Sequence, residues 1–251
     1  MIEKHLWQLD LLGAWRLRDG GQQVRVTLRQ QRLIAILALK GTQPRALLAG
    51  TLWPESSERQ ATGSLRESIW TVNHQLPGLL ESDGQTLSLA DTVVIDLDEV
   101  RKRVAAAEPG RRARQRVELL QKMRHADLLP GWYEDWVLTE QDRWTRLRLT
   151  VLERIAQEFL KNGETAYATD AAQCAVDIDP WRESSIALLL DAHLAEGDYA
   201  RTLQLYESFA DRLRGEFGVA PSDRITSLVT GLLTAGRYGG GRSTGSLPVV
   251  S

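Results

Sequence analysis

The spacing of hydrophobic residues changes several times within the first part of the chain. Short runs typical of strands occupy residues 5–12, 14–18 and 24–27, with glycine-containing turns between them. The next run, residues 29–40, has helical spacing and ends at Gly41. One side of that helix is apolar, with Leu33, Ile34, Ile36 and Leu37. This part of the sequence therefore predicts a small sheet followed by a buried helix.

Two more helices and a hairpin follow. Pro44 can begin the second helix, and Trp53-Pro54 ends it. The third spans about residues 57–76, and its apolar residues recur at intervals of 4, 3 and 4 as Leu65, Ile69, Val72 and Leu76. Residues 79–81 and 86–89 flank Asp83-Gly84, which is a hairpin signal, and residues 93–95 can add a strand. This order predicts an N-terminal winged helix-turn-helix, whose third helix enters a DNA major groove.

From about residue 95 the chain has only helical patterns, and it repeats itself when shifted by 34 residues. Leu152 then falls on Ile186, and Asn162-Gly163 falls on Glu196-Gly197. A helix-turn-helix period of this length is typical of tetratricopeptide repeats. Ala166 and Ala200 also coincide, and small residues there predict close approach of the paired helices. The fold class is thus an α+β winged helix-turn-helix followed by an all-α tetratricopeptide-like domain.

The changes in pattern define three segments. We expect a winged-helix DNA-binding domain over residues 1–96 and a helical repeat domain over residues 97–235. Residues 236–251 are rich in Gly and Ser, with few apolar anchors, and predict a flexible tail.

The composition and motifs of the chain limit the kinds of functional site that it can contain. The single cysteine, Cys174, excludes an intrachain disulfide and a Cys-rich zinc site, and the four histidines lack zinc-ligand spacing. No nucleophile elbow, phosphate loop or paired acid and base stands out, so we expect no catalytic residue, cofactor or metal. The N-terminus lacks the pattern of a signal peptide, and no apolar run is long enough to span a membrane, which predicts a cytoplasmic protein without membrane contact.

The net charge of the chain does not by itself indicate nucleic-acid binding. The net charge is −2, and residues 1–95 hold ten basic and nine acidic side chains. Residues 101–124 differ, with nine basic residues against Glu108 and Glu118. This stretch is either a pair of solvated helix faces or a surface for phosphates or an acidic partner.

The third helix supplies the candidate DNA contacts, because several of its polar residues lie off the apolar stripe. Arg and Asn can contact guanine and adenine edges, and Thr can meet a thymine methyl group or a phosphate. The candidates are Arg59, Thr62, Arg66, Asn73 and His74. Trp70 is expected instead to pack on a neighbouring element.

Three aromatic residues mark the start of the helical region. Trp132, Tyr133 and Trp136 are expected to anchor the first helices of the repeat domain to its core. The alternative is that they line a docking pocket for a partner.

Several motifs together resemble the SARP/AfsR-type bacterial transcriptional activators. The motifs are Leu52-Trp53-Pro54, Ala61 with Leu65-Arg66, the run from Asp127 to Val137 (DLLPGWYEDWV), Asp177-x-Asp179-Pro180, and the segment from Leu213 to Ser222. The resemblance covers residues 5–235. It implies an OmpR-like winged helix joined to a bacterial transcriptional activation domain. It also implies an activator that binds promoter repeats in double-stranded DNA, usually as a homodimer, and helps to recruit RNA polymerase subunits.

The chain departs from this family on the third helix. The family typically carries basic residues where this sequence has Thr71, Asn73 and His74, whereas Arg66 is retained. The Asp83-Gly84-Gln85 turn also lacks a basic residue. Fewer cations predict weaker, less salt-dependent DNA binding. The alternative function is therefore a tetratricopeptide-type interaction scaffold whose DNA-binding domain has weakened specificity.

Overall fold

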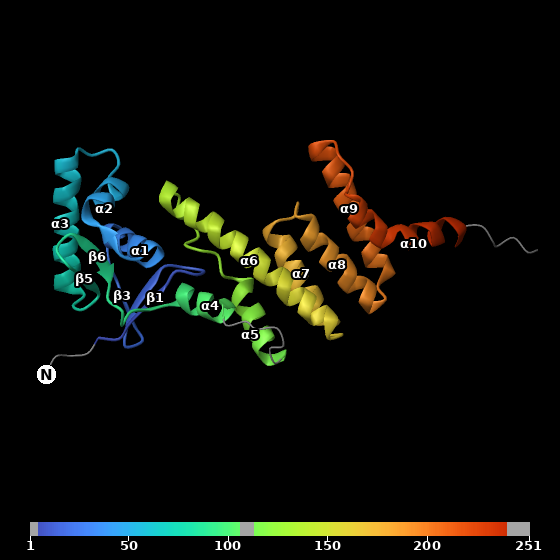
Figure 1. Ribbon diagram of the computed structural model, residues 1–251, viewed down its shortest axis with the longest axis horizontal. Coiled ribbons are helices and arrows are strands. Elements are labelled where there is room, and N and C mark those ends of the chain that lie inside the picture. The colour runs from blue at the N-terminus through green and yellow to red at the C-terminus, as the bar shows by residue number, and fades with distance from the viewer. Residues whose placement is uncertain (1–4, 106–112, 240–251) are drawn as a thin grey trace, which may run out of the picture. The chain divides into compact units, whose positions relative to one another are not determined.

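The computed structural model describes residues 5–105 and 113–239, and the chain forms two compact units (Figure 1). The first unit spans Met1–Arg146 and the second spans Leu147–Ser251. Helix α6 (Asp135–Lys161) contains the point of division. This division is between compact units. The boundary expected between residues 96 and 97 separates domains that would fold independently, and it stays a prediction.

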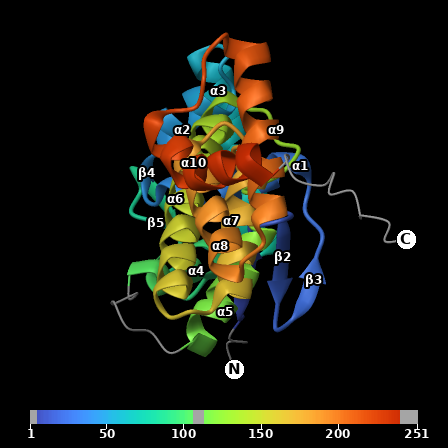
Figure 2. The same ribbon diagram turned by 90° about the vertical axis from the view of Figure 1, so that its right-hand side faces the viewer.

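The first unit contains two small sheets. The N-terminal sheet has the order β3 (Gln22–Val24), β2 (Arg16–Asp19), β1 (Trp7–Asp10), β7 (Val94–Ile95). Only the β1–β7 pair is parallel, and β3 lies at the edge beside β2 (Figure 2). The second sheet has the order β4 (Gln43–Pro44), β6 (Thr86–Leu89), β5 (Leu80–Ser82), and all its pairs are antiparallel. The predicted hairpin is thus the β5–β6 pair.

Three helices lie between the two sheets in sequence. They are α1 (Leu28–Lys40), α2 (Arg45–Leu52) and α3 (Glu58–Gln75). The four apolar residues predicted to line α1 are all buried, and Gly41 ends the helix with a φ of +70°. Such a positive φ suits Gly because it has no Cβ. Sheet, three helices and hairpin make the predicted winged helix-turn-helix, and this part of the fold class is confirmed.

The first unit continues well beyond β7. Asp96 begins α4 (Asp96–Ala105), and its carboxylate accepts hydrogen bonds from the backbone N–H groups of Leu11 and Leu12 at 2.9 and 3.0 Å. After α5 (Ala113–Arg124), Leu128 forms an antiparallel bridge with Leu12, and the Leu129 N–H donates to the Leu11 carbonyl at 2.8 Å. The strand that opens the chain is therefore held by two segments that follow the winged helix.

The aromatic residues of the DLLPGWYEDWV run have unequal environments. Trp136 is buried, and its ring meets that of Trp132 edge to face at a centroid distance of 6.5 Å. Tyr133 is 80% exposed, so the expectation that it anchors the helices is wrong. Within this run the buried Leu129 adopts a positive φ of +43°, a conformation that residues other than Gly rarely adopt. Trp136 is buried and Trp132 is half-buried within the first unit, and their role in anchoring the repeat domain stays a prediction.

The second unit is made of helices. They are the C-terminal part of α6, then α7 (Thr165–Ile178), α8 (Glu183–Glu196), α9 (Tyr199–Phe217) and α10 (Asp223–Gly239). Glycine turns at Gly163 and Gly197 separate α6 from α7 and α8 from α9, as the 34-residue repeat predicts. Helices α7 and α8 pack side by side (Figure 1). The tetratricopeptide-like part of the fold class is confirmed.

Two details of the helical region differ from expectation. Ala166 and Ala200 are exposed, and the alanines of α7 that pack in the interior are Ala168, Ala171, Ala172 and Ala175. Their spacing of three and four residues places them on the opposite side of the helix from Ala166. Helix α10 extends to Gly239, so residues 236–239 of the predicted tail are helical. The rest of that tail lies outside the described residues.

Candidate nucleic-acid interface

Helix α3 has a well-defined start and a buried side. The Ser57 hydroxyl accepts a hydrogen bond from the Gln60 N–H at 3.4 Å, and the Gln60 side chain accepts one from the Ser57 N–H at 3.2 Å. This reciprocal capping box satisfies two N–H groups that the first helical turn leaves free. The predicted stripe from Leu65 to Leu76 is buried throughout. The opposite side of α3 therefore faces away from the core of the first unit.

The predicted DNA-contact residues gather on that opposite side. Arg59, Arg66, Asn73 and His74 are exposed, and Thr62 is half-buried. Successive residues of an α-helix are about 100° apart, so all five lie within about 60° of the direction of Arg59. Among the described residues, neither Arg59 nor Arg66 has an ion pair or a hydrogen bond from its side chain. The structure brings the five together on one surface, and their contact with DNA stays a prediction.

Trp70 does not pack on a neighbouring element, and that expectation is wrong. The side chain is 67% exposed and lies among the five candidates on the outer side of α3. Its ring stacks on that of His74, with a centroid distance of 5.3 Å and an interplanar angle of 5°. The helical spacing carries the signal, because residue 70 follows Arg66 by four and precedes Asn73 by three. The opposite expectation rests on residue type, because tryptophan is highly buried on average.

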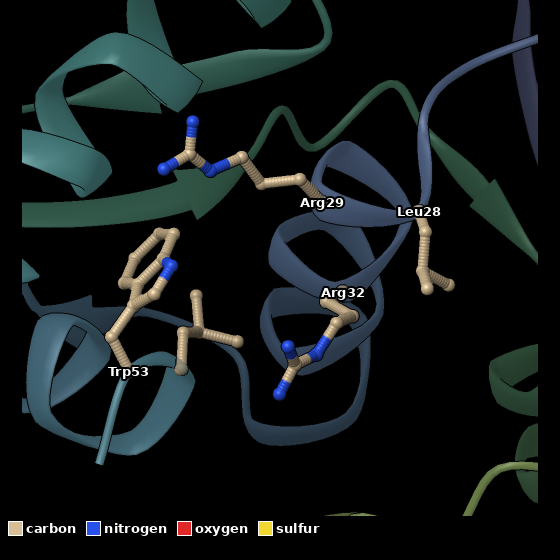
Figure 3. Close-up of a pocket in the computed structure, with 5 residues that line it drawn as sticks. Leu28, Arg29, Arg32 and Trp53 are labelled. Carbon is tan, nitrogen blue, oxygen red and sulfur yellow. The ribbon is translucent and has the colours of Figure 1, made fainter. Parts of the chain in front are cut away.

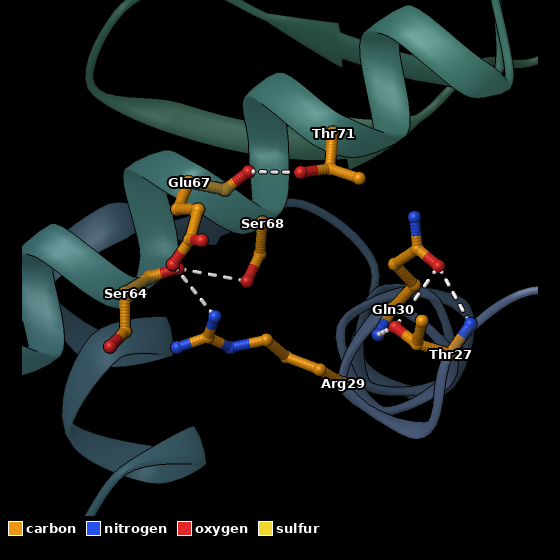
Figure 4. Close-up of polar contacts among 7 residues, drawn as sticks. All are labelled: Thr27, Arg29, Gln30, Ser64, Glu67, Ser68 and Thr71. Carbon is orange, nitrogen blue, oxygen red and sulfur yellow. Dashed lines mark hydrogen bonds and ion pairs between the residues drawn. The ribbon is translucent and has the colours of Figure 1, made fainter.

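Helix α1 holds α3 through polar contacts that sequence analysis did not find (Figure 4). The Arg29 guanidinium donates to the Glu67 carboxylate at 2.7 Å, and the Gln30 amide donates to Gln75 at 2.8 Å. Gln30 also completes a capping box with Thr27 at the start of α1. On α3 itself, the Thr71 hydroxyl donates to the Glu67 carbonyl at 2.8 Å. Arg29 thus neutralises a carboxylate that borders the exposed surface of α3.

The wing has no cation at its turn. The Asp83 carboxylate accepts hydrogen bonds from the backbone N–H groups of Thr86 and Gln85, at 2.6 and 3.0 Å. The bonds from Thr86, and then that from Gln85, lower the pKa of Asp83 despite the opposing effect of burial. Glu81 on β5 is exposed as well. The turn of the wing thus presents carboxylates rather than cations, and the nearest described cation is Arg45, whose guanidinium donates to the Ser82 hydroxyl at 3.0 Å.

A pocket of 260 Å³ lies at the start of α1 and the end of α2 (Figure 3). Its lining residues are Leu28, Arg29, Arg32, Leu52 and Trp53. The Arg29 guanidinium lies over the Trp53 ring at 5.4 Å while it pairs with Glu67, and Arg32 pairs with Glu134 at 2.9 Å. Because both guanidinium groups already face carboxylates of the same unit, the pocket lacks the free positive charge that an anion requires.

The basic stretch at residues 101–124 is only partly described. Arg101 pairs with Asp98 and Arg114 pairs with Glu118, and the side chains of Arg101 and Arg114 are exposed. Arg116 is buried, whereas Arg111 and Arg112 lie outside the described residues. The pairing resembles that of solvated helix faces, and a role toward phosphates or an acidic partner stays a prediction.

Within residues 5–105 and 113–239, no three His, Cys, Asp or Glu side chains lie close enough together to hold a metal ion. A search of the same residues found no helix that combines the length and the apolar character of a membrane span.

Comparison with known proteins gives a family match and a similarity to solved structures. A family model described as "Bacterial transcriptional activator domain" matches residues 95–233, more than half of the chain. A solved structure of Mycobacterium tuberculosis EmbR in complex with a low affinity phosphopeptide is similar in fold, with a TM-score of 0.70 and 15% sequence identity. That similarity covers 92% of this chain, which spans 66% of the EmbR chain. A comparison with curated proteins found no match.

Proposed function

Because the chain belongs to the bacterial transcriptional activator domain family, as a regulator of the SARP/AfsR type, we propose that it binds promoter DNA through its winged helix and helps RNA polymerase engage the promoter. The resemblance recognised in the sequence is confirmed by the family match. Binding to promoter repeats, action as a homodimer on DNA, contact with RNA polymerase subunits and a cytoplasmic location are parts of the proposal. Residues 1–96 would carry the DNA contacts, and residues 97–235 would carry the protein contacts.

The observation that supports DNA binding is the outward surface of α3. Arg59 and Arg66, whose guanidinium groups have no partner within residues 5–105 and 113–239, lie on the same side of the helix as Asn73. Arginine can donate two hydrogen bonds to guanine, and asparagine can exchange two with adenine. A helix whose apolar side is buried and whose other side presents these groups has the arrangement that major-groove readers use.

A second candidate function is supported by the scarcity of charge around that surface. Thr71 is engaged with the helix backbone, and the wing presents Glu81 and Asp83 rather than cations. Fewer phosphate contacts weaken nonspecific attraction to DNA. The chain would then act mainly as a protein-interaction scaffold through its helical repeats.

Mobility-shift titrations of the full chain against its own upstream promoter region distinguish the two functions. We expect specific retention of the promoter fragment, and we expect Arg66→Ala to weaken it by about fivefold or more, because a lost bidentate contact to a base costs about 1–3 kcal/mol. Repeating the titration at two salt concentrations shows whether Arg66 contacts a base or a phosphate. Loss of one phosphate contact lowers the salt slope by about 0.9, whereas loss of a base contact leaves the slope nearly unchanged.

The matched control is Arg201→Ala, which removes an exposed arginine of α9 in the second unit and should leave retention unaltered. Unchanged retention by Arg66→Ala would remove Arg66 from the interface. The absence of any retention at low salt would contradict DNA binding and favour the scaffold.

Glu67→Gln is expected to strengthen DNA binding by about two- to fivefold, because it removes a negative charge beside the proposed interface and releases Arg29. The effect should fade as salt is raised. The ion pair is exposed on both sides, so the variant should lose less than about 1 kcal/mol of stability. Fluorescence anisotropy with labelled promoter DNA measures the change, and Glu216→Gln, an exposed site on α9, is the control of equal charge. Weaker binding by Glu67→Gln would show that its pairing with Arg29 orients the interface.

A further inference from the structure

The most exposed large apolar group on the winged helix is Trp70 of α3, with 67% of its surface accessible. Its ring is not loose, because it stacks almost parallel on His74 one helical turn later. His74 covers one broad side of the indole ring and leaves the other side uncovered by it. With 67% of its surface accessible, Trp70 is a flat apolar group that the described elements of the first unit leave largely open.

The neighbours of Trp70 on the helix are polar. Arg66 precedes it by one turn and Asn73 follows it by about one turn, so an apolar group lies between two groups that can donate hydrogen bonds. Any partner that lies along this surface must present a polar edge, then an apolar group, then another polar edge. An apolar docking surface for a protein would instead place further apolar residues beside the tryptophan.

Gly63 shows that close approach is possible along the same side of α3. A Cβ atom built at Gly63 would meet nothing within 4 Å, so no packing constraint requires glycine there. Glycine within a helix is about 1 kcal/mol less favourable than alanine. Because Gly63 has no side chain, the surface of α3 there lies close to the helix backbone. The Trp70 side chain projects further from the helix axis. A rigid object can approach the backbone near Gly63 and receive Trp70 at its own surface.

We propose that Trp70 is a specificity-determining residue that contacts the 5-methyl group of a thymine in the major groove, an inference that rests on the proposed DNA binding. The thymine methyl is the apolar group that the base pairs present in that groove, and the polar base edges around it suit Arg66 and Asn73. His74 is a positioning residue, because its ring holds the indole in one orientation.

The test uses the full chain and duplexes selected by it from a random-sequence library. Each thymine of the selected site is replaced in turn by deoxyuridine, which lacks only the methyl group. At one position in each half-site, we expect the replacement to weaken binding by about fourfold, the value of one buried methyl group. Trp70→Ala should bind the thymine duplex with a similar loss, and should no longer distinguish thymine from deoxyuridine at that position.

The control is Trp181→Ala, which removes a partly exposed tryptophan from the second unit and should retain the thymine preference. The inference is overturned if the unaltered chain ignores every deoxyuridine replacement, or if Trp70→Ala keeps the preference. It is also overturned if Trp70→Ala weakens binding equally on all sequences, which would indicate contact with the sugar-phosphate backbone or a protein. If the unaltered chain enriches no sequence at all, the proposed DNA binding itself fails, and that result is visible before any variant is made.

Discussion

Glu153→Ala is expected to lower the free energy of unfolding of the second unit by about 2–4 kcal/mol. Glu153 projects from α6 with only 12% of its side chain exposed, and it binds the start of α8. Its carboxylate accepts hydrogen bonds from Arg182 at 2.7 and 3.0 Å and from the Ser185 hydroxyl at 2.9 Å, and it also binds Ser184. Ser185 is fully buried, so removal of the carboxylate leaves a hydroxyl without its acceptor. Urea unfolding followed by circular dichroism measures the loss.

The same carboxylate predicts a dependence on pH. Burial raises the pKa of Glu153, but the bonds from Arg182, Ser184 and Ser185 outweigh it, and the pKa lies below the ordinary value of 4.5. A carboxylate with a lowered pKa in the folded state stabilises the fold above the unfolded pKa, and this contribution is lost as the pH falls through the folded pKa. The difference in stability between the unaltered chain and Glu153→Gln should therefore be constant near pH 7 and shrink below pH 4.5.

Glu216→Gln serves as the control in the same unit, because Glu216 is exposed on α9. Its effect on stability should be within about 0.5 kcal/mol at every pH. A Glu153→Gln difference that persists unchanged below the folded pKa would show that packing, rather than the charge, joins α6 to α8.

Asp96→Ala is expected to destabilise the first unit by about 2–3 kcal/mol. The Asp96 carboxylate accepts three backbone hydrogen bonds, from Leu11, Leu12 and Leu97. Leu11 and Leu97 are fully buried, so their N–H groups would lose their partners without access to water. The loss also separates the end of β1 from the start of α4.

The matched control for this variant is Asp91→Ala, at an exposed position five residues earlier. Urea unfolding should show a lower midpoint for Asp96→Ala alone. Asp96→Asn should fall between the two, because an amide keeps one acceptor oxygen but adds a donor group among other donors. Equal stability of Asp96→Ala and the unaltered chain would mean that the bridge between Leu12 and Leu128 is sufficient to hold β1.

The outward surface of α3 could be predicted from the sequence because it is a local property. Once Leu65, Ile69 and Val72 define the buried side, helical geometry assigns Arg59 and Arg66 to the other side. Trp70 could have been assigned in the same way. The position of residue 70 in the helix predicts its exposure better than the general tendency of tryptophan to be buried.

Other features depend on residues far apart in the chain. Asp96 meets Leu11 across 85 positions, and Glu153 meets Ser185 across 32. Nothing in the spacing of either carboxylate distinguishes it from an acidic residue on a solvated surface. The pair of Arg29 and Glu67 was missed for the same reason, since each residue lies on a different helix and has ordinary neighbours in sequence.

Hydrophobic periodicity, glycine turns and the 34-residue repeat are sufficient to predict the order of the elements and the fold class. These signals act within a few residues, or repeat at a fixed interval, so no knowledge of packing is needed to read them. The packing of separate elements sets which polar groups meet, leaves Tyr133 exposed, and brings Asp96, Leu128 and Leu129 to the end of the first strand. Those outcomes follow from how separate elements pack, because burial and hydrogen bonding between distant segments depend on their relative position in space and not on the spacing within either one.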